Sequence, residues 1–398
     1  MLKSYKWTRR TASIIFLLYL SNPVVAGDNY EVNGFVTQGY FYTDNNNFYG
    51  DSQNGSFDFR ELGINGAWNL KDDLLLSGQA VSRLAGGVDD GDPVIDYLLL
   101  DYRFFEDQNG SAGISFGRNK NPFGLYNKTR DVSFTRPSIV LPQSLYFDKA
   151  RNLELSSDGI RLYGRKFFDS GVWDSELVAG IPRKDKNIEF AYLNRDWDGE
   201  FSSSKGYLFR TEYRPHDYSW VAGLNYGNFY FDFDGPDSPA PGAPGDGDVD
   251  IGILAFSLQY NLQHWSFTSE YMRQSISWGS LGGLYALQPK NVSESYYVQA
   301  ERRINDQLSL FIRRDILYID KNDRDGKRAE ALSGRPAHSQ YAFDWTLGVG
   351  WRPAKNWLVR AEWHRIEGTG WLAVQDNPVA SDTEEDWDML SLQATYRF

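Results

Sequence analysis

The segment YAFDWTLGVGWRP, residues 341–353, alternates strictly between two kinds of side chain. Every second residue from Tyr341 to Trp351 is aromatic or aliphatic, whereas the positions between them are small or polar, as at Asp344 and Gly348. Alternation with a period of two indicates a β-strand with two unlike faces. The apolar face is aromatic at both ends and aliphatic in its middle, which is typical of a strand that crosses a bilayer between two interfacial aromatic belts.

Other segments repeat this pattern, among them residues 160–165, 220–226 and 357–364. In the last of these, Trp357 and Trp363 share one face, and arginine, glutamate and histidine share the other. A packed soluble core does not tolerate so many charged side chains, because a buried unpaired charge is very costly. The second face therefore indicates a water-filled lumen.

The connections between these segments are alternately short and long. Seven short turns end near residues 73, 110, 171, 218, 264, 307 and 356. The eight long connections are predicted at 44–56, 84–92, 119–157, 183–205, 234–249, 278–291, 321–340 and 369–384. The sequence thus predicts an all-β fold, a transmembrane antiparallel up-and-down β-barrel of about 16 strands with both termini on the short-turn side. A barrel of this size leaves an aqueous channel.

The two ends of the chain support export to a membrane. Residues 1–26 have a basic start, a short apolar core and small residues at Val24 and Ala26, which predicts a signal peptide cleaved after Ala26. The remaining residues, 27–398, form one predicted barrel domain. The last strand, DMLSLQATYRF, alternates up to the terminal Phe398 and is similar to the closing strand of outer-membrane barrels, whose last aromatic residue is read by the assembly machinery.

Charge is distributed unevenly along the chain. The whole chain has a net charge of −12, and removing the four basic residues of the signal peptide leaves −16. An acidic protein of this kind is not expected to bind nucleic acid. The long connection 119–157 departs from this average, because it holds six basic residues against three acidic ones.

The connection 119–157 is rich in large apolar residues and contains Pro122, Pro137 and Pro142, which predicts an ordered loop rather than a disordered one. We expect it to fold into the barrel as a constriction and to favour anions, since guanidinium groups can hold two oxygens at once. The candidate constriction and solute-binding residues are Arg118, Lys120, Lys128, Arg130, Arg136 and Arg151 in and beside the loop, with Arg103, Arg161, Arg165, Arg210 and Arg360 on lumen faces of strands.

The alternative for these cations is structural. Lumen-facing acids could pair with them and leave a wide channel with little selectivity. The acids predicted on that face are Glu61, Asp101, Glu212, Glu301, Asp344 and Glu362.

The motif GRNKNPFGLYN, residues 117–127, resembles the entry to the inward-folded third loop of trimeric Gram-negative porins. Its Gly-Arg-x-Lys-x-Pro-Phe-Gly pattern is similar to phosphate-selective and dicarboxylate-type porins. The resemblance implies a homotrimer in the outer membrane, in contact with lipid and lipopolysaccharide. It also implies passive diffusion of small hydrophilic solutes, anionic or neutral.

Two other classes of function remain open at this point. A secreted soluble carbohydrate-binding or carbohydrate-active all-β protein would also explain the aromatic residues and the signal peptide. An outer-membrane enzyme would need a Ser/His or Asp/His set at one rim, and the four scattered histidines offer none. We therefore predict no enzymatic activity, no cofactor and no metal site; the acidic segment 232–250 is better explained as a solvated loop than as a calcium site.

Overall fold

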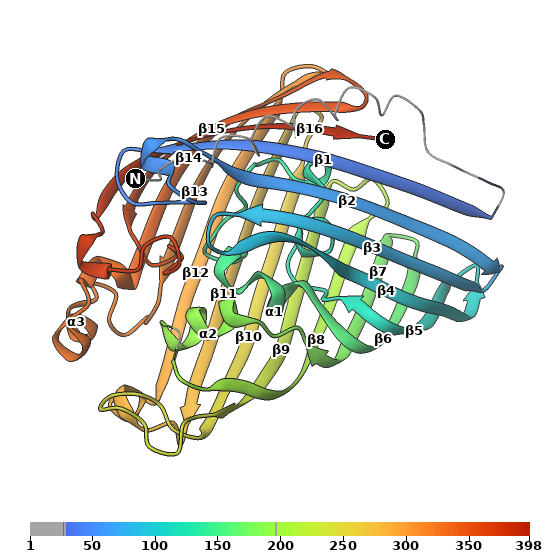
Figure 1. Cartoon of the computed structure of the whole chain (residues 1–398). Helices are drawn as coiled ribbons and strands as arrows, with labels where there is room; N and C mark the ends of the chain where they lie inside the picture. The colour runs from blue at the N-terminus through green and yellow to red at the C-terminus, as the bar shows by residue number, and fades with distance from the viewer. Residues whose placement is uncertain (1–26, 28, 196) are drawn as a thin grey trace, which may run out of the picture.

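The computed structural model describes residues 27, 29–195 and 197–398, so the predicted signal peptide lies outside the described residues (Figure 1). Sixteen antiparallel strands form one closed barrel, in which each strand pairs with its neighbours along the chain. This confirms the predicted fold and strand number. The strands are β1 (Tyr30–Thr43), β2 (Ser56–Lys71), β3 (Leu74–Ala85), β4 (Asp89–Asp107), β5 (Gly110–Lys120), β6 (Ser156–Phe168), β7 (Gly171–Pro182), β8 (Glu200–Pro215), β9 (Trp220–Asp234), β10 (Gly247–Asn261), β11 (Trp265–Gly279), β12 (Lys290–Arg303), β13 (Leu308–Tyr318), β14 (Tyr341–Ala354), β15 (Trp357–Gly368) and β16 (Asp386–Arg397).

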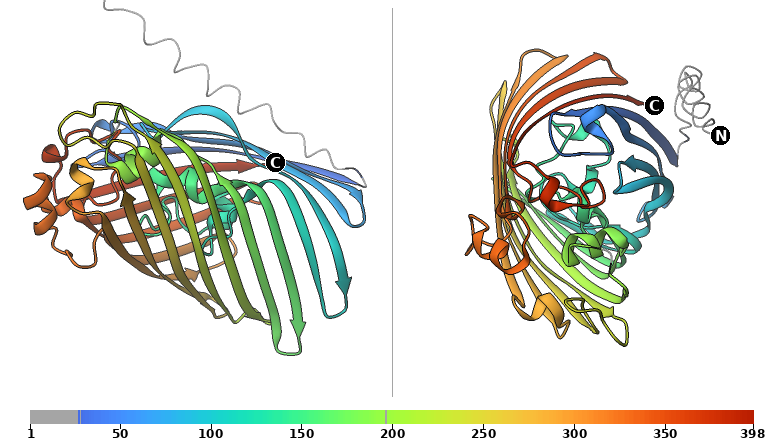
Figure 2. Two further views of the ribbon diagram at one scale, coloured as in Figure 1. Left: turned by 90° about the horizontal axis from the view of Figure 1, so that it is seen from below. Right: turned by 60° about the vertical axis from the view of Figure 1, so that its left-hand side comes forward.

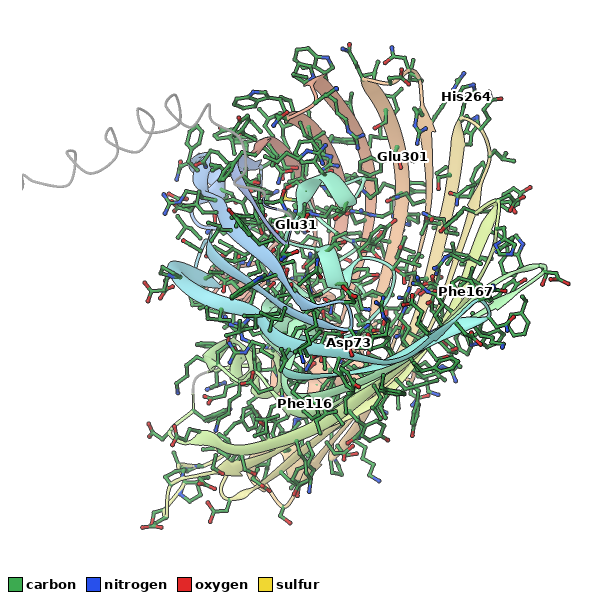
Figure 3. All side chains as sticks on the ribbon, turned by 90° about the vertical axis from the view of Figure 1, so that its right-hand side faces the viewer. Glu31, Asp73, Phe116, Phe167, His264 and Glu301 are labelled. Carbon is green, nitrogen blue, oxygen red and sulfur yellow. The ribbon has the colours of Figure 1, made fainter. Side chains whose placement is uncertain are left out.

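The barrel closes between β1 and β16. Phe35 pairs with Arg397 in the antiparallel register. Beyond it, Gly34 and Phe398 exchange two backbone hydrogen bonds of 2.9 Å. Both ends of the barrel chain therefore lie at one rim, the rim that carries the short turns. His264, in the turn between β10 and β11, marks this rim in Figure 3.

The two faces of the wall differ as the alternation predicts. On β14, Trp345 and Leu347 point outward and are each 47% exposed, whereas Asp344 and Thr346 point inward and are buried. Leu390 and Leu392 of β16 are exposed in the same way, and Ser391 between them is fully buried. A continuous exposed apolar surface of this kind is stable only in contact with lipid or another apolar surface.

One long connection was predicted wrongly. The acidic, glycine-rich segment 84–92 resembles a loop in composition, but β3 continues to Ala85 and β4 begins at Asp89. Only residues 86–88 connect the two strands, with Gly86 in the left-handed region at φ +54°. Asp89 pairs with Ala85 in the sheet. The prediction from composition is wrong here because aspartate residues can also occupy the end of a strand that is exposed to water.

Three of the other long connections each carry an α-helix. These are α1 (Arg151–Leu155) between β5 and β6, α2 (Lys186–Leu193) between β7 and β8, and α3 (Lys327–Ser333) between β13 and β14. None of the helices in the described part of the chain is long and apolar enough to cross a membrane. The connection between β5 and β6, residues 121–155, is hereafter called the internal loop. In Figure 2 its ribbon, with α1, lies inside the ring of strands.

Candidate functional site

The internal loop is held by hydrogen bonds to side chains on the far walls of the barrel. The backbone N–H of Gly124 donates to Asn225 of β9 at 3.1 Å, and that of Leu125 donates to Glu270 of β11 at 3.0 Å. Further bonds run from Ser144 to β13 and from Ile139 and Val140 to β15. Buried backbone donors need partners, and inward-facing carboxylates of the wall supply them.

Apolar packing reinforces this attachment. Leu145, Tyr146 and Leu153 of the internal loop have no exposed surface. The Tyr146 hydroxyl donates to Glu270 at 2.5 Å, and its ring lies 5.7 Å from that of Phe123. The loop therefore has a fixed shape, because its apolar residues and its backbone both have partners on the wall.

Three basic residues of the internal loop region, Lys120, Arg130 and Arg151, are bound with Arg83 of β3 in a buried network of ion pairs. Lys120 lies 2.5 Å from Asp96 of β4 and 2.7 Å from Asp131 of the loop. Arg151 also pairs with Asp131. These side chains are at most 11% exposed, so their charges are neutralised within the protein.

The second half of this network joins the loop to β3. Arg130 lies 3.1 Å from Glu154 and 3.4 Å from Asp148. Asp148 also accepts from Arg83 of β3 at 3.2 Å, and the Tyr49 hydroxyl donates to it. Each arginine of this network thus has a carboxylate partner, as a buried charge requires.

Two carboxylates of this network, Asp131 and Asp148, stay ionised far into the acid range. Burial works against the charged form of Asp131, but Lys120 and Arg151 outweigh it and hold the pKa of that carboxyl well below its usual range. Asp148 behaves in the same way: burial opposes ionisation, and Arg83, Arg130 and Arg151 lower its pKa. The ion pairs of these two carboxylates are therefore present at neutral pH. Glu154 differs, because burial outweighs Arg130 and raises its pKa to about 8.

Arg136 and Arg360 serve the loop backbone rather than the lumen. Arg360 of β15 is buried and donates to the carbonyl oxygens of Ser133, at 2.8 Å, and of Arg136. Arg136 donates to the carbonyl oxygens of Ser138, at 2.9 Å, and of Ile139. Guanidinium groups used in this way hold the loop against the wall and offer little surface to a solute.

A different set of cations faces the lumen on β6 and β8. Arg161 and Arg165 of β6 and Arg210 and Arg214 of β8 point inward, and their side chains keep between 15% and 46% of their surface exposed. We call these four residues the arginine row. Three acids on β7 and β8 lie between them, namely Asp174, Glu176 and Glu212.

The internal loop meets the arginine row at a single carboxylate. Lys128 of the loop lies 2.5 Å from Glu176, Arg161 lies 2.8 Å from it, and Arg210 lies 4.0 Å from it. The Lys128 side chain remains 37% exposed. Arg161 also lies 3.7 Å from Asp101, and Arg210 also pairs with Glu212. Lys128 and the four arginines of the row thus face four carboxylates, namely Asp101, Asp174, Glu176 and Glu212, which leaves a net charge of +1 where the loop reaches the wall.

No family model matches the sequence, and no curated protein matches it either. The structure, in contrast, is similar to solved outer-membrane proteins. The outer membrane channel DcaP of Acinetobacter baumannii aligns with a TM-score of 0.57 at 12% identity, over 94% of this chain and 99% of that chain. The anion-selective porin from Comamonas acidovorans aligns with a TM-score of 0.55 at 10% identity, over 93% of this chain and 99% of that chain. The chain has a porin fold.

A loop-deletion variant of OmpT, an outer membrane protein of Vibrio cholerae, aligns equally well, with a TM-score of 0.57 at 12% identity over 93% of this chain and 99% of that chain. Identities this low show the porin fold alone. Any statement about what passes through this barrel has to come from its own side chains.

Within the porin fold, two of the sequence-predicted residues lie away from the loop. Arg118 was predicted to enter the constriction, but β5 continues to Lys120, which places Arg118 on the outward face in line with Phe116. There it pairs with Asp158 at 2.7 Å. Arg103 lies near the short-turn rim, where it donates to the Asp72 carbonyl oxygen at 2.7 Å.

Other cations of the lumen are not among the candidate residues predicted from the sequence. Arg214 has the same parity on β8 as Arg210, and the alternation predicts it on the lumen face, where the structure places it. Lys149, Arg195 and Arg335 lie in long connections between strands, where no periodicity operates, and only the structure brings them together.

Proposed function

We propose that this protein is an outer-membrane channel for passive diffusion of small hydrophilic solutes, with a preference for anions. The observation that carries the proposal is the group of three cations around Glu176, formed where the internal loop meets the arginine row. Charged side chains at a narrowing set ion selectivity, because low-dielectric walls focus their potential into the channel.

The cations divide into two groups with different roles in this proposal. Lys128, Arg161, Arg165 and Arg210, together with Arg214, keep exposed surface and face the lumen. The buried cations of the loop network hold the loop in place and add little to the field, because nearby carboxylates cancel their charge. Selectivity therefore comes from the arginine row and Lys128, which gives a mild preference for carboxylate and phosphate groups.

The exposed apolar wall favours a membrane protein over a secreted soluble one. Large apolar side chains such as Ile64, Leu98, Phe116, Leu258 and Leu347 point outward and are each at least 47% exposed. A soluble carbohydrate-binding protein would need to cover this surface. A homotrimer in contact with lipopolysaccharide, as the sequence resemblance implies, would cover part of it, and chemical cross-linking in native outer membranes tests that assembly.

Liposome swelling tests the channel itself. Proteoliposomes are diluted into isotonic solutions of neutral sugars, dicarboxylates and phosphate, and the initial swelling rates are compared. We expect swelling in all three, with dicarboxylates and phosphate faster than sugars of equal size. If correctly folded protein gave no swelling in any of the three solutions, the proposed channel would be contradicted.

A further inference from the structure

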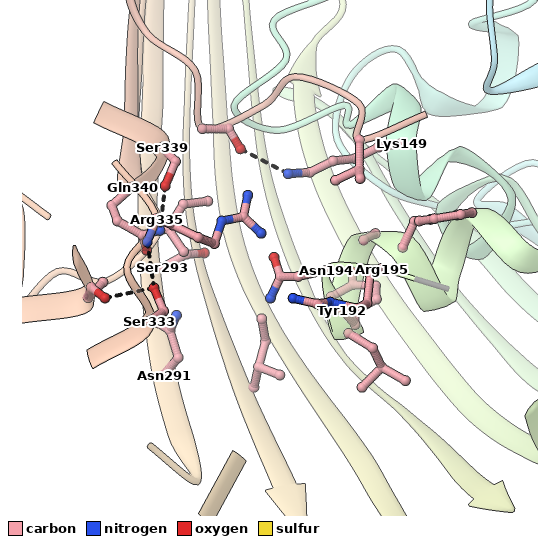
Figure 4. A pocket seen from close by; sticks show the side chains of 18 of the residues that line it. Lys149, Tyr192, Asn194, Arg195, Asn291, Ser293, Ser333, Arg335, Ser339 and Gln340 are labelled. Atoms are coloured by element: carbon pink, nitrogen blue, oxygen red, sulfur yellow. Dashed lines mark hydrogen bonds between the residues drawn. The ribbon is translucent and has the colours of Figure 1, made fainter. Parts of the chain in front are cut away.

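The long connections enclose a second basic site, apart from the arginine row. A cavity of about 260 Å³ lies between five connections at the barrel end opposite the short turns (Figure 4). Its lining comes from the internal loop, from the segment of α2 and the residues after it, and from the connections β11–β12, β13–β14 and β15–β16. At ~30 Å³ for each water molecule, the space equals about nine waters.

Three cations lie in the lining of this cavity, and each comes from a different connection. They are Lys149 of the internal loop, Arg195 after α2, and Arg335 between α3 and β14. None of the described residues that line the cavity is acidic. This differs from the loop network and the arginine row, where carboxylates lie beside every guanidinium.

The three cations have few partners of their own. The Lys149 ammonium donates to the Gly370 carbonyl oxygen at 2.9 Å. Arg195 lies over the ring of Trp197 at 4.5 Å, and no residue in the described part of the chain accepts a hydrogen bond from its guanidinium group. Among the described residues, none accepts a hydrogen bond from the Arg335 side chain, and its Nε atom is buried without a partner. Donors with unused capacity beside a cavity favour a ligand that brings oxygen acceptors.

Much of the remaining lining is apolar, beside uncharged polar side chains such as Gln274 and Asn291. The rings of Trp278 and Tyr285 lie 5.8 Å apart. The Trp197 indole N–H donates to Tyr285 at 3.1 Å, and the Trp278 indole N–H donates to the Tyr192 carbonyl oxygen at 3.0 Å. Aromatic side chains that are fixed by hydrogen bonds form a preorganised apolar surface.

We propose that this cavity binds a small organic anion with an apolar body, such as an aromatic carboxylate, before it enters the lumen. The carboxylate would lie among Lys149, Arg195 and Arg335, and the apolar body would lie against Trp278 and Tyr285. The inference deepens the proposed function, because it names the class of anion, and it rests on that function only for the step from binding to entry.

The protonation of Lys149 gives the site a pH dependence. Burial, with a contribution from the nearby Arg335, lowers the pKa of the Lys149 ammonium to about 8. The other titratable groups that line the cavity with it come from the facing connections: Arg195, Arg335, Tyr192 and Tyr285. Burial also raises the pKa of Tyr192. Burial raises the pKa of Tyr285 to about 12, so that group stays neutral between pH 7 and pH 9. Over this range Lys149 loses its charge, and anion affinity should fall.

Calorimetric titration of the detergent-solubilised full chain with phenylacetate tests the site without any conductance measurement. We expect binding of phenylacetate, with benzyl alcohol and phenethylamine at least about tenfold weaker, which corresponds to ~1.4 kcal/mol. Lys149→Gln and Arg335→Gln should each weaken phenylacetate binding by about tenfold, and Lys149→Gln should also remove the loss of affinity between pH 7 and pH 9. Lys327→Gln is the matched control, because Lys327 is 77% exposed on α3 and does not line the cavity.

Equal binding of phenylacetate and benzyl alcohol would overturn the inference, as would an equal loss of affinity in Lys327→Gln. A protein that conducts small anions but does not bind phenylacetate would refute the cavity site and leave the proposed channel intact. Binding without any channel activity would refute the proposed channel alone.

Discussion

Replacement of Lys128 by glutamine should reduce the preference for anions without disturbing the fold. Lys128 is one of three cations around Glu176, and Arg161 and Arg210 still neutralise that carboxylate after the change. The substitution therefore removes one exposed positive charge and leaves no buried carboxylate unpaired. This separates the effect on selectivity from an effect on stability.

The size of the effect follows from Coulomb's law. An ion that passes ~7 Å from the Lys128 ammonium interacts with it by ~0.6 kcal/mol in water. Salt at about 0.1 M has a Debye length near 10 Å and reduces this to ~0.3 kcal/mol. Loss of the Lys128 charge disfavours an anion in the channel and favours a cation by the same amount. The free-energy difference between the two ions therefore changes by ~0.6 kcal/mol. The ratio of anion to cation permeability should therefore fall about threefold.

The assay is the zero-current potential of single channels in planar bilayers under a tenfold KCl gradient. Lys128→Arg should retain the wild-type ratio. Lys166→Gln removes the same charge from the outward face of β6 and should change nothing. If the permeability ratio of Lys128→Gln equals that of the wild type, or if Lys166→Gln shifts it equally, the reasoning about the cations around Glu176 is wrong.

Three further predictions concern the fold and the loop. Arg130→Met should destabilise the protein by ~1–3 kcal/mol, because it removes a buried donor that contacts both Glu154 and Asp148. Urea unfolding in detergent measures this, and no loss of stability would contradict it. Burial opposes ionisation of Asp131 and Asp148, but neighbouring cations lower their pKa, so their contribution to stability is complete above the unfolded value of about 3.9 and is lost only as the pH falls through the lower folded values. The destabilisation caused by Asp131→Asn, measured by urea unfolding in detergent, should therefore be the same at pH 7 and at about pH 4.5, and a smaller cost at pH 4.5 would contradict this reasoning. Leu347→Arg on the outward face should cost ~2–4 kcal/mol and Gln259→Arg on the lumen face less than about 1 kcal/mol, and equal costs would exclude a lipid-facing wall.

The wall of the barrel could be predicted from sequence because each strand encodes it locally. Trp345 and Leu347 alternate with Asp344 and Thr346 whether or not the partner strands are known. The short turns and long connections then give the strand number. The error at 84–92 shows the limit, since composition does not distinguish a polar strand end from a loop.

The candidate site could be predicted only in part. Sequence indicated that the internal loop is basic, but the pairing of Lys120 with Asp96 depends on how the loop packs against β4. Whether the Arg118 side chain faces the lumen or the outside depends on whether β5 ends before or after that residue. Adjacent residues of a strand point to opposite faces, so a shift of one residue reverses the direction of a side chain. The cavity of Lys149, Arg195 and Arg335 joins separate connections, so no local pattern could reveal it.

The sign of the zero-current potential of the wild-type channel tests the central claim most directly. With the purified protein in a planar bilayer under a KCl gradient, the cations around Glu176 predict a potential of the sign that chloride permeation produces. A potential of the opposite sign would show that potassium passes more readily, and it would contradict an anion-favouring lumen.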